Sequence, residues 1–281
     1  MTKPKITIII GPTASGKSGL AVRLAQKQNS SIVNADSMQI YSDLSIISAR
    51  PTQAEMMGIP HLLYGYVDAW TQGTVQDWLN RVIPVLKELE NPIVVGGTGL
   101  YLSLLINGIN EIPDIDPTVR KFVRQMDLSE IKKQVIDCSF TDPQRLMRAL
   151  EVQLSTGKPL AYFQKLPKKK LIDADFNIIF INPDRDILYQ NCEKRFYQMI
   201  KTGGIEEIEH LLTLKPTGGV LKAIGVPEII SYIHGYISKE EMCKQAILST
   251  KHYAKRQITW FRHQIQSDII IKKADELIIE Q

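Results

Sequence analysis

The stretch that decides the fold is Gly11-Pro12-Thr13-Ala14-Ser15-Gly16-Lys17-Ser18, which directly follows the apolar run at residues 6–10. Two glycines with four residues between them, followed by Lys and Ser, form the P-loop pattern, which joins a buried strand to a helix. Glycines let backbone N–H groups turn toward a phosphate, and the start of the helix adds partial positive charge. The stretch therefore predicts a site for a di- or triphosphate, in which Lys17 contacts the terminal phosphate and Ser18 ligates Mg²⁺.

Apolar runs alternate with amphipathic segments along the chain, which is typical of βαβ units in a parallel sheet. The pattern predicts strands at residues 5–10, 31–34, 92–95, 176–182 and 267–272. It predicts helices at residues 17–28, 74–90, 99–106, 142–156, 184–202, 204–212 and 238–264. We therefore predict an α/β fold, with a P-loop parallel sheet flanked by helices and a helical C-terminal part. The core takes residues 1–107 and 141–281, and residues 108–140, which lack clear periodicity, form a short helical insertion.

Composition excludes several classes of protein. The chain has 281 residues, 44% of them hydrophobic, with a net charge of +4, which is ordinary for a soluble globular protein. No apolar run approaches the ~18 residues of a membrane span, and the N-terminus does not resemble a signal peptide. Cys138, Cys192 and Cys243 show neither zinc-site spacing nor a disulfide framework. We expect a cytoplasmic protein that does not associate with membranes.

Polar residues follow the second and third predicted strands. Asp36, after the second strand, is placed to hold Mg²⁺ or to act as a general base, although it is also suited to cap a turn. Gln39 is able to pair with an adenine edge, or it is a surface residue. Thr98 follows Gly96-Gly97 and offers a hydroxyl to a phosphate or substrate, unless the segment is a plain turn into a helix. The missing carboxylate at this strand end argues against ATP hydrolysis.

Basic residues gather on two predicted helices. Arg145 and Arg148 share one helix face, which either grips phosphodiesters or is a solvated charged surface. On the last helix, Lys255 and Arg256 alternate with aromatic residues such as Trp260. This mixture suits a nucleic-acid backbone with unstacked bases, while part of the aromatic set also serves helix packing.

Six sequence blocks together resemble the tRNA dimethylallyltransferase family, the bacterial isopentenyl-tRNA transferases. They occur in the order typical of that family and span nearly the whole chain. The blocks are Gly-Pro-Thr-Ala-Ser-Gly-Lys-Ser at 11–18, Asn-Ala-Asp-Ser-Met-Gln-Ile-Tyr at 34–41, Arg-Pro-Thr at 50–52, Val-Gly-Gly-Thr-Gly-Leu-Tyr at 95–101, Asp-Pro-Gln-Arg-Leu-Met-Arg-Ala-Leu-Glu at 142–151 and Lys-Arg-Gln-Ile-Thr-Trp-Phe-Arg at 255–262.

The resemblance implies transfer of a dimethylallyl group from dimethylallyl diphosphate to the exocyclic amine of the adenosine on the 3′ side of the anticodon. The tRNAs would read codons that begin with U, and the products would be N6-isopentenyladenosine and diphosphate. Partners would be Mg²⁺ and the anticodon stem-loop of tRNA, and we expect a monomer. The insertion is shorter than is usual in the family.

The resemblance also implies roles for individual residues. The P-loop would hold the prenyl diphosphate together with Arg195, Asp36 would accept the amine proton, and Thr98 would contact the reacting groups. The contacts to tRNA would come from Asp36, Ser37, Met38, Gln39, Thr98, Arg120, Gln144, Arg145, Leu146, Met147, Arg148, Lys255 and Arg256.

Two other functions are compatible with part of the sequence. A small-molecule or nucleoside kinase would explain residues 11–18 but not the blocks at 34–41, 142–151 and 255–262. Such a kinase would turn over ATP with a small acceptor and ignore tRNA. A non-catalytic RNA-binding protein with a degenerate P-loop is disfavoured because Lys17, Ser18 and Asp36 are all present.

Overall fold

The computed structural model describes residues 3–136 and 140–277, which form two compact units. The larger unit comprises residues 1–106 and 172–281, and the smaller unit comprises residues 107–171. Cys192 and Cys243 are buried free thiols, while Cys138 lies outside the described residues. In the described part of the chain, no helix is both long and apolar enough to cross a membrane.

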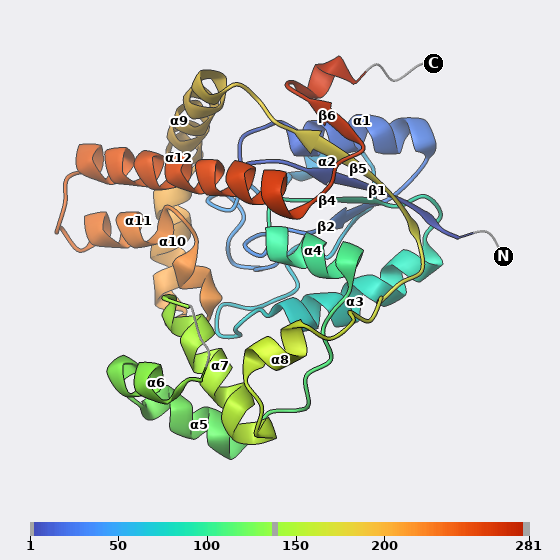
Figure 1. Cartoon of the computed structure of the whole chain (residues 1–281). Helices are drawn as coiled ribbons and strands as arrows, with labels where there is room; N and C mark the ends of the chain where they lie inside the picture. The colour runs from blue at the N-terminus through green and yellow to red at the C-terminus, as the bar shows by residue number, and fades with distance from the viewer. Residues whose placement is uncertain (1–2, 137–139, 278–281) are drawn as a thin grey trace. The chain divides into compact units, whose positions relative to one another are not determined.

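The larger unit is built on a six-stranded parallel sheet in the order β3-β2-β4-β1-β5-β6 (Figure 1). This confirms the predicted α/β fold. The central strands are rich in Ile and Val because both faces of a parallel sheet are covered. The two-residue strand β3 was not predicted, since so short a pairing leaves no pattern in the sequence. The strands are β1 (Lys5–Ile10), β2 (Ile32–Asn34), β3 (His61–Leu62), β4 (Ile93–Gly96), β5 (Asp175–Ile181) and β6 (Ile269–Ile271).

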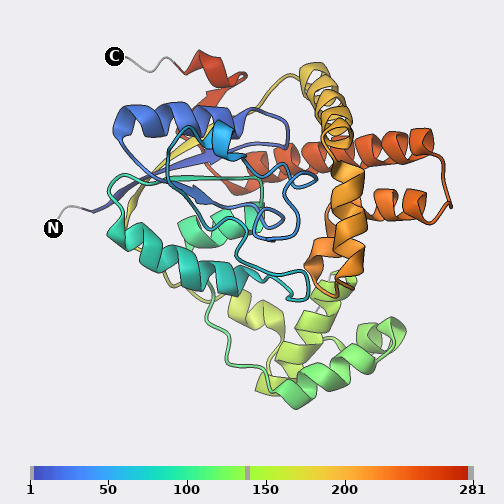
Figure 2. The same cartoon turned by 180° about the vertical axis from the view of Figure 1, so that it is seen from behind.

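Helices cover the two faces of this sheet. Helix α1 packs its Leu20 and Leu24 against one face, while α3 and α4 lie on the opposite side (Figures 1 and 2). Trp78 of α3 stacks on Tyr101 of α4 with 4.7 Å between ring centroids. The helices of this unit are α1 (Lys17–Gln28), α2 (Gln53–Met56), α3 (Val75–Glu88), α4 (Gly99–Asn107), α9 (Arg185–Lys201), α10 (Gly204–Thr213), α11 (Val226–Ile233) and α12 (Lys239–Gln264), with short 3₁₀ turns at Gly219–Lys222 and Ala274–Glu276.

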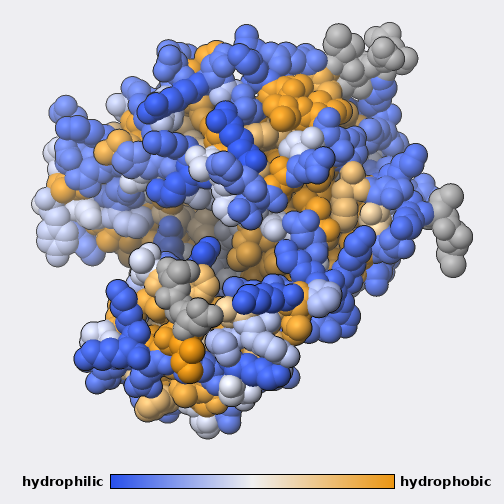
Figure 3. Space-filling model, in the orientation of Figure 1, coloured by the Kyte–Doolittle hydropathy of each residue, from blue (hydrophilic) through white to orange (hydrophobic). Residues whose placement is uncertain are grey.

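A second core lies beside the sheet, where α9 to α12 pack on the segment that follows β2. Tyr41 and Leu44 of that segment meet Phe196, Ile229 and Met242 from three different helices. Hydrophilic side chains cover much of the face shown in Figure 3, with an apolar area over the β5–β6 edge, where Ile270 is exposed. The second core thus attaches the helical C-terminal part to the end of the sheet at which the P-loop lies.

The smaller unit contains α5 (Pro117–Gln125), α6 (Leu128–Gln134), α7 (Pro143–Thr156) and α8 (Leu160–Gln164). Its extent differs from the predicted insertion at 108–140, because α7 belongs to it as well. Val123 of α5 and Ile131 of α6 are buried against Leu146 and Leu150 of α7. Two short helices alone bury too little apolar surface to form a core, so α7 completes the unit. Asp142 caps α7 by accepting a hydrogen bond from Arg145 N, as its Asp-Pro start predicts.

Candidate active site

The P-loop connects β1 to α1 at the carboxyl edge of the sheet. Gly11 has no room for a side chain, because a Cβ there would lie 2.7 Å from the carbonyl oxygen of Ile181. Gly16, the N-cap residue before α1, takes a left-handed conformation at φ 86°, which glycine adopts without strain. The buried hydroxyl of Ser15 has no partner among the described residues. The loop therefore keeps the Ser15 hydroxyl available to a phosphate.

Two partly buried cations lie at this loop. Lys17 Nζ donates a 2.6 Å hydrogen bond to the carbonyl oxygen of Pro12, and Arg195 of α9 donates to Thr13 Oγ1. Burial lowers the pKa of Lys17 to about 8, and it also lowers the pKa of Arg195. Within residues 3–136 and 140–277, neither cation forms a salt bridge with a carboxylate. Two desolvated and unpaired cations next to a P-loop form an anion site.

Asp36 is positioned by the fully buried Asn34 at the end of β2. Asn34 Oδ1 accepts from Asp36 N at 2.8 Å, while Asn34 Nδ2 donates to the carbonyl oxygens of Asp36 and Leu63 at 3.0 Å. Trp78 Nε1 donates to the backbone oxygen of Asn34 at 2.7 Å. Asp36 Oδ1 accepts from Met38 N at 2.9 Å. The Asp36 carboxylate is thus held through Oδ1. This hydrogen bond also caps the turn at residues 36–38, which was the alternative role predicted for Asp36.

Thr98 lies beside this turn at the start of α4. Its Oγ1 accepts from Ser37 N at 2.9 Å and donates to Ser37 Oγ at 3.2 Å. Gly97, the residue before it, has no room for a side chain beyond a hydrogen because Gln257 approaches closely. The structure therefore brings together the ends of β2 and β4, as the strand order predicts.

Gln257 of α12 is a site residue that the sequence reasoning missed. The side chain is 5% exposed, and its Oε1 accepts from Thr13 N while its Nε2 donates to Gly97 O, both at 2.8 Å. Its position beside Arg256 in the block at 255–262 was the one feature of the sequence that could have pointed to it. No pattern in a single sequence separates a buried Gln from an exposed one. Gln257 thereby joins the P-loop to the end of β4.

A cavity of about 350 Å³ opens between these groups. Asp36 and the cations Arg195, Lys222 and Arg256 line it together with the hydroxyl residues Thr13, Ser37, Ser48 and Thr250. Tyr253 lines it as well, and burial raises the pKa of its phenol above the ordinary value. The apolar lining is Met38, Ile47, Phe196, Met199, Ala223 and Ile224. A cavity with a cationic end, a carboxylate and an apolar wall fits an anionic ligand that carries a small hydrocarbon group.

The donor set of the site suits Mg²⁺ only in part. In the part of the chain that the structure describes, no cluster of three or more His, Cys, Asp or Glu residues is suited to a metal. Mg²⁺ usually takes one or two protein oxygens and completes its shell with substrate phosphates and water. Ser18 is exposed in the first turn of α1 and offers such an oxygen, so the site suits Mg²⁺ bound together with a diphosphate.

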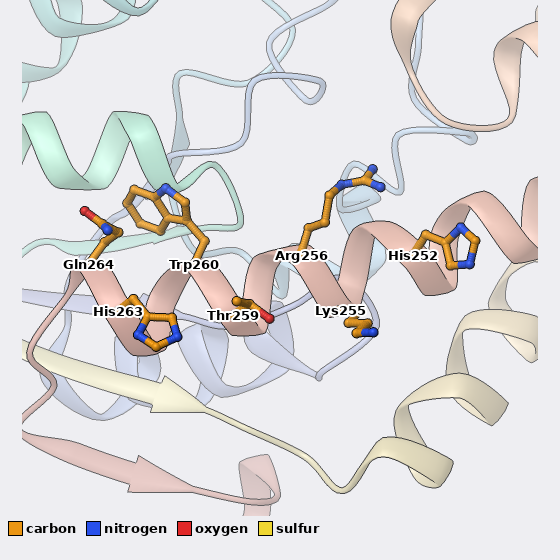
Figure 4. Close-up of a pocket in the computed structure, with 7 residues that line it drawn as sticks. All are labelled: His252, Lys255, Arg256, Thr259, Trp260, His263 and Gln264. Carbon is orange, nitrogen blue, oxygen red and sulfur yellow. The ribbon is translucent and has the colours of Figure 1, made fainter. Parts of the chain in front are cut away.

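A groove of about 560 Å³ follows the outer side of α12 (Figure 4). Its side chains are basic, aromatic or neutral, and no carboxylate lines it. The Trp260 ring covers Gly99, where a Cβ would lie 2.3 Å from it. Figure 4 shows the lining residues, which are His252, Lys255, Arg256, Thr259, Trp260, His263 and Gln264. Arg256 also lines the cavity that contains Asp36, so the groove and the cavity share a wall.

The smaller unit brings two predicted tRNA contacts together. Arg120 of α5 and Arg148 of α7 lie 3.8 Å and 3.7 Å from the buried carboxylate of Glu151. Both arginines are partly exposed. Gln144 and Arg145 are exposed in the first turn of α7, where Arg145 lies over the ring of Phe140.

Three predicted contacts have other roles in the structure. Leu146, which was predicted as a tRNA contact, is buried in the core of the smaller unit because α7 turns this residue inward. Met147 is half-buried against the same core. Gln39 Nε2 donates to the carbonyl oxygens of Ser48 and Ala49, which occupies both amide protons and leaves only Oε1 to face a ligand.

Comparisons with known proteins agree with this geometry. Residues 39–264 match the family model described as IPP transferase. Curated relatives named tRNA dimethylallyltransferase include that of Bartonella quintana, which is 41% identical over 99% of this chain and 100% of its own. That of Rhizobium etli is 40% identical over 92% of this chain and 93% of its own.

Solved structures give the same result. A tRNA isopentenylpyrophosphate transferase of Bacillus halodurans has a TM-score of 0.72 at 30% identity, covering 96% of this chain and 90% of that one. A eukaryotic dimethylallyltransferase acting on tRNA has a TM-score of 0.82 at 27% identity, covering 96% of this chain and 74% of that one. The chain therefore belongs to the IPP transferase family.

Proposed function

We propose that this protein transfers a dimethylallyl group from dimethylallyl diphosphate to the exocyclic amine of the adenosine on the 3′ side of the anticodon. The tRNAs are those that read codons beginning with U. The observation that carries this proposal is the cavity that Asp36 lines together with Arg195 and with Thr13 of the P-loop. The names of the relatives support the same reaction.

The reaction breaks the bond between the allylic carbon and the diphosphate oxygen, and forms a bond between that carbon and the adenine nitrogen. Negative charge therefore builds up on the departing diphosphate. The backbone N–H groups of the P-loop, with Lys17 and Arg195, stabilise this charge from fixed positions in a site with little water, where such interactions are strong. Mg²⁺ held by Ser18 would neutralise further charge on the diphosphate when bound.

The adenine amine loses a proton as the new bond forms. An aromatic amine is a weak nucleophile, so a base within hydrogen-bond reach accelerates the step. Asp36 serves as this base through Oδ2, because Oδ1 already accepts from Met38 N. Thr98 keeps the turn that carries Asp36 in place through its hydrogen bonds to Ser37.

The RNA contacts come from two places. The groove on α12, with Lys255 and Arg256, binds phosphates, and Trp260 offers an aromatic face to an unstacked base. Arg120, Gln144, Arg145 and Arg148 contribute from the smaller unit. We further propose that the protein acts as a monomer in the cytoplasm, where its cysteines stay reduced.

A transfer assay tests the proposal. The purified protein, Mg²⁺, dimethylallyl diphosphate and unmodified tRNA are incubated, and the nucleosides are analysed by mass spectrometry. We expect N6-isopentenyladenosine, lost in Lys17→Ala and kept in Lys27→Ala, a control at an exposed lysine of the same helix. Absence of the product with several such tRNAs, together with turnover of ATP on a small acceptor, would refute the proposal in favour of a kinase.

A further inference from the structure

We propose that Gln257 is a positioning residue that couples RNA binding at the α12 groove to diphosphate binding at the P-loop. Each ligand would then strengthen the binding of the other. This inference rests on the proposed function, because it names how the sites of its two substrates communicate.

The coupling has a direct path through one side chain. Gln257 Oε1 accepts from Thr13 N, and Gln257 Nε2 donates to Gly97 O. The amide group is nearly inaccessible to water, so a broken bond would leave a buried polar group unpaired, at a cost of about 1–3 kcal/mol. The P-loop and the end of β4 are therefore tied to α12, so a displacement of one is passed on to the other.

Thr13 transmits the position of α12 into the diphosphate site. Its backbone N–H is held by Gln257 and its hydroxyl by Arg195, which is one of the two partly buried cations of the site. Thr13 also lines the cavity that contains Asp36. A shift of Gln257 therefore changes both the P-loop backbone and the partner of the cation.

The same turn of α12 meets the RNA groove. Arg256 precedes Gln257, and Trp260 lies three residues beyond it, so the groove residues and the buried amide belong to one rigid helical segment. RNA that shifts Arg256 and Trp260 therefore moves Gln257 with them. By linkage, a diphosphate that orders the P-loop must strengthen RNA binding by the same factor.

Calorimetry of the intact protein tests this coupling. The probes are inorganic diphosphate with Mg²⁺ and an anticodon stem-loop RNA that carries the target adenosine. For the wild-type protein, we expect the Kd of each probe to fall by about 5- to 150-fold when the other is present. Gln257→Met keeps the length of the side chain but removes both hydrogen bonds. In this variant, the fold-change in Kd that each probe causes for the other should fall to near one, while the Kd for RNA alone stays within about twofold of the wild-type value. Gln245→Met, at an exposed residue of the same helix, should keep the wild-type factor.

A merely structural role would give a different result. If Gln257 only stabilised the fold, Gln257→Met would lower the melting temperature and leave the coupling factor unchanged, and this outcome overturns the inference. Gln257→Glu provides a second variant, because it keeps the acceptor for Thr13 N but loses the donor to Gly97 O; retention of wild-type coupling there also overturns it. In both variants the KM for dimethylallyl diphosphate should lose its dependence on RNA concentration. Failure of the wild-type protein to bind either probe would instead refute the proposed function.

Discussion

Replacing Asp36 by Asn tests the proposed base with little disturbance of its surroundings. The amide oxygen can still accept from Met38 N, and Asp36 N remains bonded to Asn34 Oδ1, so the turn persists. The variant removes the negative charge and the ability to take a proton. A positioned general base contributes about 10²–10⁴ in rate, so we expect turnover to fall by that factor. This corresponds to ~2.7–5.4 kcal/mol in the activation free energy, at 1.36 kcal/mol for each tenfold change.

A second effect of the same substitution acts through Lys17. Burial lowers the pKa of Lys17 to about 8, and the charge of Asp36 opposes that shift. Asp36→Asn therefore lowers this pKa further, so Lys17 loses its charge at lower pH than in the wild-type protein. The effect disappears at acidic pH, where Lys17 is protonated in both proteins, and a comparison near pH 6.5 isolates the loss of the base.

Single-turnover kinetics with saturating RNA measure the chemical step. The RNA Kd is determined in parallel and should stay within about twofold, as expected for a group that acts mainly in the transition state. Asp43→Asn, a carboxylate on the same loop outside the cavity, is the matched control. Turnover of Asp36→Asn near that of the wild-type protein at pH 6.5 would show that Asp36 is not the base.

Three further predictions follow from contacts and charge. Because Lys17 binds diphosphate only when protonated, the diphosphate affinity measured by calorimetry should fall as pH rises through about 8. The fall should approach about tenfold per pH unit, and an affinity that does not change with pH would exclude Lys17 from the contact. Glu207→Gln weakens the charge-assisted hydrogen bonds from Ser45 N, Ile46 N and Ile47 N, which should lower the free energy of urea unfolding by ~1.5–3 kcal/mol. Because Ile47 lines the cavity, the variant should also raise the KM for the prenyl substrate, and an unchanged KM would contradict this effect. Trp78→Phe leaves the buried carbonyl of Asn34 without its donor and should lower the free energy of unfolding by ~1–3 kcal/mol, whereas an unchanged urea midpoint would refute that role.

The pattern of residues determined the elements that depend on local chemistry. The P-loop at 11–18 and the apolar runs at 5–10 and 92–95 predicted the strands and the helix that the structure contains, because glycine spacing and buried strands leave a direct trace in sequence. The capped start of α7 was predicted for the same reason: an Asp-Pro pair favours one backbone conformation wherever it occurs.

The smaller unit was predicted less completely. Helices α5 and α6 were not identified within 108–140, since each is short and buries few residues. Their shared core with α7 exists only when Val123, Ile131 and Leu150 meet in space. The same packing turns Leu146 inward, which a helix face read from sequence alone does not reveal.

By itself, the sequence determined the P-loop, the parallel sheet and the candidates Asp36 and Thr98, because motif spacing and strand ends carry that information. Arg195 was a candidate only through the resemblance to the family. Only the tertiary structure decided which groups meet. It placed Arg195 on Thr13 from a helix distant in the chain, used the amide protons of Gln39 within its own loop, and put Gln257 between the P-loop and Gly97. The physical reason is that burial and hydrogen-bond partners are properties of packed side chains, and residues far apart in sequence supply them.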